Sequence, residues 1–180
     1  MDPVIRNYIE DYHGRRHWAG SREKGESIAK EVASRLADEF RSRVFWWTED
    51  YLFSFKVAFP RKDLPNYARW ATPTTHETPA DQRLGAVTVF VSWVGPFVRL
   101  AWAYSAPDIE GHSNREEKDD PPQGLLEAHE RILTAIPTGI RVLRWEELSE
   151  VVSGVTLPPT FLAPTGPGPT VGSLLFCEYW

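Results

Sequence analysis

The clearest pattern of apolar and polar positions lies near the start of the chain and predicts an amphipathic helix over residues 22–42. Its apolar stripe recurs every four residues, at Ile28, Val32, Leu36 and Phe40. On the opposite side, glutamates stand four residues ahead of basic side chains, and each such pair stabilises a helix slightly. The charged side is therefore typical of a solvated face, and the stripe is expected to pack on a sheet.

A shorter helix is expected before this one, directly after the first two residues. Asp2 and Pro3 form a typical helix start, with the acid at the N-cap and the proline at the first helical position. Apolar side chains then recur at helical spacing as far as Tyr12, and Gly14 is expected to end the helix.

Further along the chain, the period changes to two, which predicts an antiparallel sheet between residues 44 and 105. The expected strands span residues 44–47, 51–59, 85–94 and 97–105. In the second strand, large apolar side chains alternate with Ser54, Lys56 and Ala58. One face of this strand is therefore expected to be buried and the other to be half exposed to solvent.

The last two strands are expected to form a hairpin with Gly95-Pro96 as its turn. This turn sets the register, and the predicted pairs on one face are Trp93 with Val98, Val91 with Leu100, Val89 with Trp102 and Val87 with Tyr104. All eight side chains are apolar or aromatic, which supports the register. The other face has a mixed composition, and Arg99 is expected there, opposite Ser92.

The C-terminal half of the chain predicts helices over residues 124–136 and 145–152, with a short strand at 140–143 between them. Residues 157–170 are rich in proline and glycine and are expected to wrap over the surface as an extended chain. The apolar tail, residues 171–180, is expected to dock on the body or on a second copy of the chain.

The order of a helix, four strands and then helices predicts an α+β fold in a single domain, residues 1–180. We expect an antiparallel sheet of four or more strands, with the helix at 22–42 packed on one face. The C-terminal helices are expected to lie beside this sheet.

The composition is typical of a folded domain. The chain has 180 residues, of which 42% are hydrophobic and 13% aromatic, which is enough to build a core. It has no apolar run of about 18 residues, so no membrane-spanning helix is expected. Its first residues lack the pattern of a secretory signal, and we expect a cytoplasmic protein. Cys177 is the single cysteine, which excludes an internal disulfide and a zinc finger.

Charge is distributed unevenly along the chain. Residues 1–62 carry a net charge of +2 and residues 63–180 a net charge of −7, which together give −5. Acidic side chains gather in residues 108–120, whereas Arg15 and Arg16 are the core of the best basic cluster. This distribution does not favour a nucleic-acid partner. An acidic surface suits a basic protein partner, although such a run is also typical of a solvated loop.

The sequence contains no strong catalytic or metal-binding motif. His13 and His17 have the spacing of a helical metal pair, but Gly14 and two arginines lie between them and oppose a cation. Glycine-rich nucleotide loops, zinc-protease motifs and nucleophile elbows are absent. We therefore expect no metal and no cofactor, and the leading hypothesis is not an enzyme.

Residues 60–84 form a long proline-rich segment, and connections of this length are often functional. Trp70, in its middle, either packs on the body or presents an anchor to a partner. An alternative hypothesis places an aromatic pocket under this segment. His76, Glu77 and Arg99 would then supply the polar groups of a small-molecule-binding or hydrolytic site.

Three passages resemble in style the immunity proteins of bacterial polymorphic toxin systems, which are small, acidic, tryptophan-rich α+β proteins. The passages are Phe90–Trp102, Trp145–Val152 and Thr170–Trp180, in a chain with eight tryptophans. The resemblance implies a protein that binds one toxin domain and blocks it. It also implies that acidic residues are set against a basic active site.

The leading hypothesis is therefore a non-enzymatic protein-binding domain that inhibits a toxin or effector by direct binding, with no membrane partner. The residues expected to bind the partner are Trp70, Asp108, Glu110, Glu116, Glu117, Asp119 and Asp120. A third hypothesis is a homodimer held together by the apolar tail, residues 171–180.

Overall fold

The computed structural model describes residues 1–15, 21–48, 53–59, 72–73, 87–107, 113–121, 124–155 and 168–176. Its helices are α1 (Pro3–Arg15), α2 (Ser21–Phe40), α4 (Leu126–Ala135), α5 (Trp145–Leu148) and α6 (Val171–Phe176). Its strands are β1 (Phe45–Trp47), β2 (Ser54–Ala58), β3 (Thr72–Pro73), β4 (Val87–Ser92), β5 (Phe97–Pro107), β6 (Ser113–Lys118) and β7 (Arg141–Val142). Within these ranges, no helix is both long enough and apolar enough to cross a membrane.

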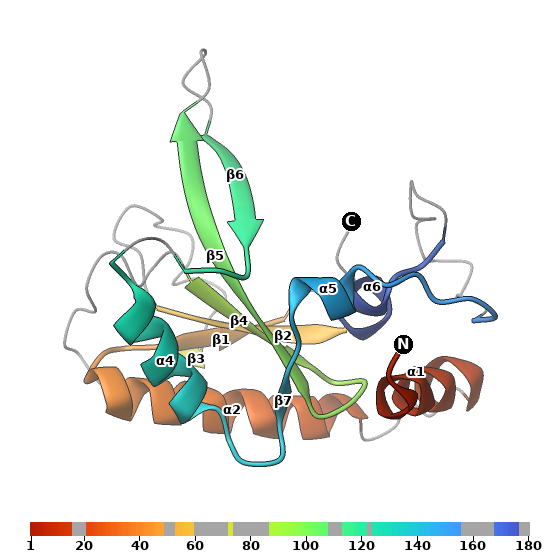
Figure 1. The fold of residues 1–180 in the computed structure, drawn as a ribbon. Helices are drawn as coiled ribbons and strands as arrows, with labels where there is room; N and C mark the ends of the chain where they lie inside the picture. Colours follow the sequence, from red (N-terminus) through yellow and green to blue (C-terminus); the bar gives the residue numbers. More distant parts are fainter. Residues whose placement is uncertain are drawn as a thin grey trace.

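The strands form one sheet with helices packed on both of its faces (Figure 1). Their spatial order is β3-β1-β2-β4-β5-β6, with antiparallel neighbours throughout, and β7 pairs in parallel with the first part of β5. Helices α2 and α4 pack on one face, and α1, α5 and α6 pack on the other. The expected α+β fold with a largely antiparallel sheet is confirmed.

Alternation along the strands divides the core between the two helical layers. Val89 contributes to the core under α2 and α4, whereas its neighbour Phe90 belongs to the core under α1 and α6. On the second face of β2, Ser54 and Ala58 are buried and Lys56 alone is partly exposed. The expectation of a half-exposed face is therefore wrong, because a second helical layer helps to cover the sheet.

The hairpin of β4 and β5 differs from the predicted register by two residues. The observed pairs are Val91 with Val98, Val89 with Leu100 and Val87 with Trp102. The connection takes four residues, Trp93–Pro96, instead of the two-residue turn expected, and within it the N–H of Val94 bonds to the hydroxyl of Ser92 at 3.1 Å. A shift of two leaves every side chain on its expected face. It also places Arg99 opposite Phe90.

The predicted helices at 22–42 and 124–136 are confirmed as α2 and α4. The helix predicted at 145–152 is shorter, because α5 ends at Leu148. Asp2 begins α1 as expected, since its Oδ1 accepts the N–H of Val4 at 2.7 Å. Gly14 does not end α1, which continues to Arg15.

Helix α6 confirms that the apolar tail docks on the body of its own chain. All six of its residues are buried. The hydroxyl of Ser92 donates a hydrogen bond to the carbonyl of Leu175 at 2.7 Å, and Ser54 donates to the carbonyl of Phe176 at 3.3 Å. Burial of α6 therefore needs no second copy. Residues 157–167 and 177–180 of the predicted wrap and tail lie outside the described residues.

The two leucines Leu174 and Leu126 provide a test of this docking. Leu174 in α6 is 0% exposed, whereas Leu126 at the start of α4 is 65% exposed. We expect Leu174→Ala to lower the free energy of unfolding by about 2–5 kcal/mol through lost burial and a new cavity. Leu126→Ala should change it by less than about 0.5 kcal/mol. Urea unfolding measures both values, and equal losses would contradict the packing of α6.

Candidate functional site

Strand β5 continues past the end of β4 and leads into the acidic region of the chain. The last pair between β4 and β5 is Val87 with Trp102, and beyond it β5 pairs only with β6 among the described strands. Residues 103–107 and 113–117 therefore form a two-stranded ribbon that rises from the sheet (Figure 1). We call residues 103–120 the acidic arm.

The acidic arm holds most of the net negative charge of the protein. It contains six acidic and two basic residues, a net charge of −4 in a chain whose total is −5. Residues 113–118 are a strand in register with β5, so the interpretation of this run as a loop is wrong for these residues. The backbone hydrogen bonds that pair β6 with β5 do not depend on apolar alternation.

The arm brings together most of the residues predicted to bind a partner. Glu116 and Glu117 lie on β6, and Asp119 and Asp120 follow it directly. Asp108 and Glu110 fall between β5 and β6 in the sequence, outside the described residues, and Trp70, His76 and Glu77 also lie outside them. The partner-binding or pocket role predicted for each of these residues stays a prediction.

Asp119 holds one side of the arm's base to the body of the protein. Its Oδ1 lies 3.5 Å from Nε of Arg99, a side chain that is only 1% exposed. The guanidinium of Arg99 also lies 5.5 Å from the centre of the Phe90 ring. In addition, Asp119 accepts a hydrogen bond from the backbone N–H of Trp145 at the start of α5. The end of β6 is thereby connected to both β5 and α5.

The surroundings of Asp119 differ from those of an exposed contact residue. Burial raises the pKa of its carboxyl, and the positive charge of Arg99 opposes that rise only in part. Its second oxygen, Oδ2, is buried without a hydrogen-bond partner in the described part of the chain. Asp119 is therefore placed to fix the arm, whereas the next residue, Asp120, is exposed to solvent.

Trp102 holds the other side of the arm's base. Its side chain is 0% exposed, and its indole N–H donates a hydrogen bond to Nδ1 of His129 on α4 at 3.2 Å. Since Nδ1 accepts, the imidazole is neutral and carries its proton on Nε2. Burial lowers the pKa of His129, an effect that the nearby carboxylates of Glu130 and Asp120 partly oppose.

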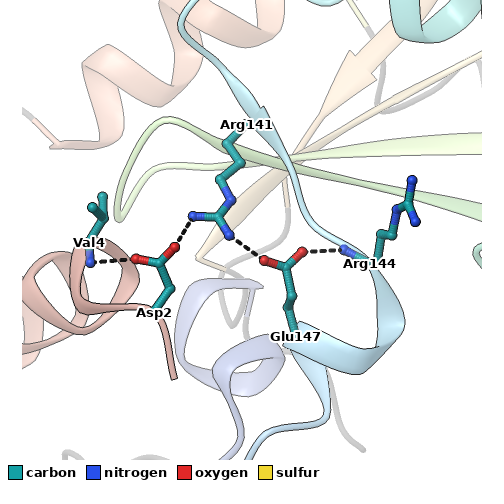
Figure 2. Close-up of polar contacts among 5 residues, drawn as sticks. All are labelled: Asp2, Val4, Arg141, Arg144 and Glu147. Atoms are coloured by element: carbon teal, nitrogen blue, oxygen red, sulfur yellow. Dashed lines mark hydrogen bonds and ion pairs between the residues drawn. The ribbon is translucent and has the colours of Figure 1, made fainter.

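A second polar cluster joins the N-terminus to the C-terminal half of the chain (Figure 2). Arg141 donates one hydrogen bond to Asp2 at 2.5 Å and another to Glu147, whose second oxygen accepts the N–H of Arg144 at 3.1 Å. The Arg141 contact holds the pKa of Asp2 below its usual value. The side chains of Asp2, Arg141 and Glu147 pair with one another, so we interpret this cluster as structural.

The sequence analysis identified Asp2 as a helix cap but missed its partner. Asp2 and Arg141 are 139 positions apart, and no local pattern connects them. Because the folded pKa of Asp2 lies below its unfolded value, the contact stabilises the fold above about pH 4. This contribution is lost as the pH falls through the folded pKa.

His13, which the sequence analysis considered as half of a metal pair, is partly buried near the end of α1. Its Nε2 lies 2.9 Å from the carbonyl of Leu174, and its ring meets the Phe53 ring edge to face at 5.4 Å. Burial lowers its pKa. His17 lies outside the described residues. Among those described, no group of three or more histidine, cysteine or acidic residues could hold a metal ion.

No family model, curated protein or solved structure matches this chain. The chemistry of the acidic arm is electrostatic: carboxylates gathered on and beside a ribbon attract and orient cationic side chains. The contacts of Arg99 and Trp102 hold the base of this ribbon on both faces of the sheet.

Neighbouring residues Asp119 and Asp120 test this assignment. We expect Asp119→Ala to lower the free energy of unfolding by about 1–3 kcal/mol, because buried Arg99 loses an acidic partner. Asp120→Ala removes the same charge from an exposed position and should cost less than about 0.5 kcal/mol. Chemical denaturation at neutral pH measures both variants. If Asp119→Ala is as stable as Asp120→Ala, Asp119 does not hold the arm.

Proposed function

We propose that this protein is a protein-binding domain that uses the acidic arm to engage a basic surface of a partner protein. The observation that carries the proposal is the arm itself: residues 103–120 have a net charge of −4, and this segment contains a ribbon that extends beyond β4. A long-range attraction between opposite charges speeds the encounter of two proteins and orients them before contact.

The contacts at the base of the arm support this use. A two-stranded ribbon is only marginally stable in water when nothing else supports it. Here Arg99 and Trp102 connect the ribbon to α5 and α4 through Asp119 and His129. A ribbon held in one orientation loses less conformational entropy when it binds than a free loop does.

We further propose that the partner is a toxin or effector whose basic active site the arm covers. Support for this comes from the resemblance in style to immunity proteins of polymorphic toxin systems and from the acidic charge of the arm. The domain would then act as a non-enzymatic inhibitor, and it would meet its partner in the cytoplasm.

The alternative of a small-molecule-binding or hydrolytic pocket has less support in the described structure. Arg99, one of its three polar groups, is buried and contacts Asp119 and Phe90. The other two, His76 and Glu77, lie outside the described residues. We therefore prefer the protein-binding function.

A pair of charge-reversed variants tests the role of the arm. Glu116→Lys with Glu117→Lys reverses two charges on β6, and Glu127→Lys with Glu130→Lys changes the net charge by the same amount on exposed positions of α4. A partner is first captured from lysate of the source cells with the tagged wild-type protein. Surface plasmon resonance then measures association and dissociation rates for each variant.

We expect the β6 variant to associate roughly tenfold more slowly or worse, with a smaller change in dissociation, because steering acts on association. The α4 variant should stay close to wild type. Raising the salt from about 50 to about 300 mM should slow the wild type most, because it screens the arm. Equal effects of the two variants, or the absence of a stoichiometric partner, would contradict the proposal.

A further inference from the structure

Trp102 is the residue at which the acidic arm leaves the sheet. It pairs with Val87 in the last observed pair of β4 with β5, and with Lys118 at the other edge of β5. On the body side of Trp102, β5 pairs with β4, and its first two residues also pair with β7. On the arm side, its described partner is β6. Any change in how Trp102 is held therefore acts on the base of the arm.

The Trp102 side chain is held through a single titratable acceptor on α4. The indole N–H is fully buried and donates to Nδ1 of His129 at 3.2 Å. A protonated imidazole carries hydrogen on both nitrogens and accepts no hydrogen bond. Protonation of His129 would therefore leave a buried donor opposite another donor, and a buried N–H without an acceptor is costly.

We infer that protonation of His129 loosens the base of the acidic arm, so that the paired residues 103–107 and 113–118 are ordered near neutral pH and mobile in mildly acidic solution. If the arm binds a basic partner, as proposed above, the protein would release that partner when the pH falls. The ordering of the arm itself can be measured on the protein alone.

The charged groups around His129 support a response in this range of pH. Glu130 lies beside it on α4, Asp120 comes from the end of the arm, and Arg144 comes from the segment before α5. Between α4 and α2, Arg131 pairs with Glu39 at 2.7 Å. Ordinary carboxylates and guanidinium groups keep their charge between pH 7.5 and 5.5, so His129 is the group in this set that titrates there.

The sign of the effect follows from burial. Burial lowers the pKa of His129 in the folded state, so the ring binds a proton more readily when it is exposed. Acidification therefore favours the loosened state. Burial raises the pKa of Asp119, so this carboxyl binds a proton more readily in the folded state. Protonation of Asp119 therefore favours the ordered state, which is the opposite of the effect of His129. The effect of His129 can thus be separated from that of Asp119.

The test is amide hydrogen exchange, followed by mass spectrometry at pH 7.5 and 5.5 and corrected for intrinsic rates. In the wild type, we expect protection of residues 103–107 and 113–118 to fall roughly tenfold at pH 5.5. His129→Asn puts an amide oxygen near the position of Nδ1 and cannot titrate. In this variant, protection of the arm should be the same at the two pH values.

Two controls keep the result interpretable. Each variant is compared with itself at the two pH values. A loss of stability in His129→Asn that is equal at both therefore does not change the ratio of protection at pH 7.5 to protection at pH 5.5. His13→Asn removes the other histidine whose pKa burial lowers, and it should leave the response of the arm intact. The inference is overturned if arm protection in the wild type does not change with pH, or if His129→Asn shows the same fall.

Discussion

Strand β5 extends beyond the end of β4, its neighbour in the sheet, and the acidic arm depends on this extra length. Its first half pairs with β4 along one edge, and its first two residues, Phe97 and Val98, pair with β7 along the other. Its second half leaves β4 at Trp102 and has β6 as its described partner. A strand that continues alone exposes unpaired backbone groups, so β6 is needed to pair one edge. The stretch of chain that contains β6, residues 108–120, is also the one in which acidic side chains gather.

Burial of both faces of the sheet gives β5 its remaining constraints. Its side chains alternate between the core under α2 and α4 and the core under α1 and α6. Buried polar groups need partners, and Arg99 and Trp102 find theirs in Asp119 and His129. Both partners lie in the chain beyond β5, after the arm has turned back. Satisfying these two groups therefore holds the arm at its base.

Much of this fold was predictable from local pattern. The four-residue stripe predicted α2, the alternation predicted β4 and β5, and the apolar tail predicted the docking of α6. The predicted register was wrong by two residues because the connection between the strands is a four-residue loop, Trp93–Pro96, and not the two-residue turn Gly95-Pro96. Strand β6 was missed because it has no apolar alternation. The cluster of acids was visible in the sequence, whereas its anchorage depends on contacts of Arg99 with a residue 20 positions away.

The central claim is that the acidic arm binds the partner while the rest of the domain supports it. Ala103 and Glu117 pair across the ribbon, so residues 104–116 can be replaced by a two-residue Asn-Gly turn between them. Isothermal titration of the captured partner with this shortened protein is the most direct test. The account predicts a cooperatively folded domain that no longer binds the partner. A folded, shortened domain that binds with unchanged affinity would contradict it.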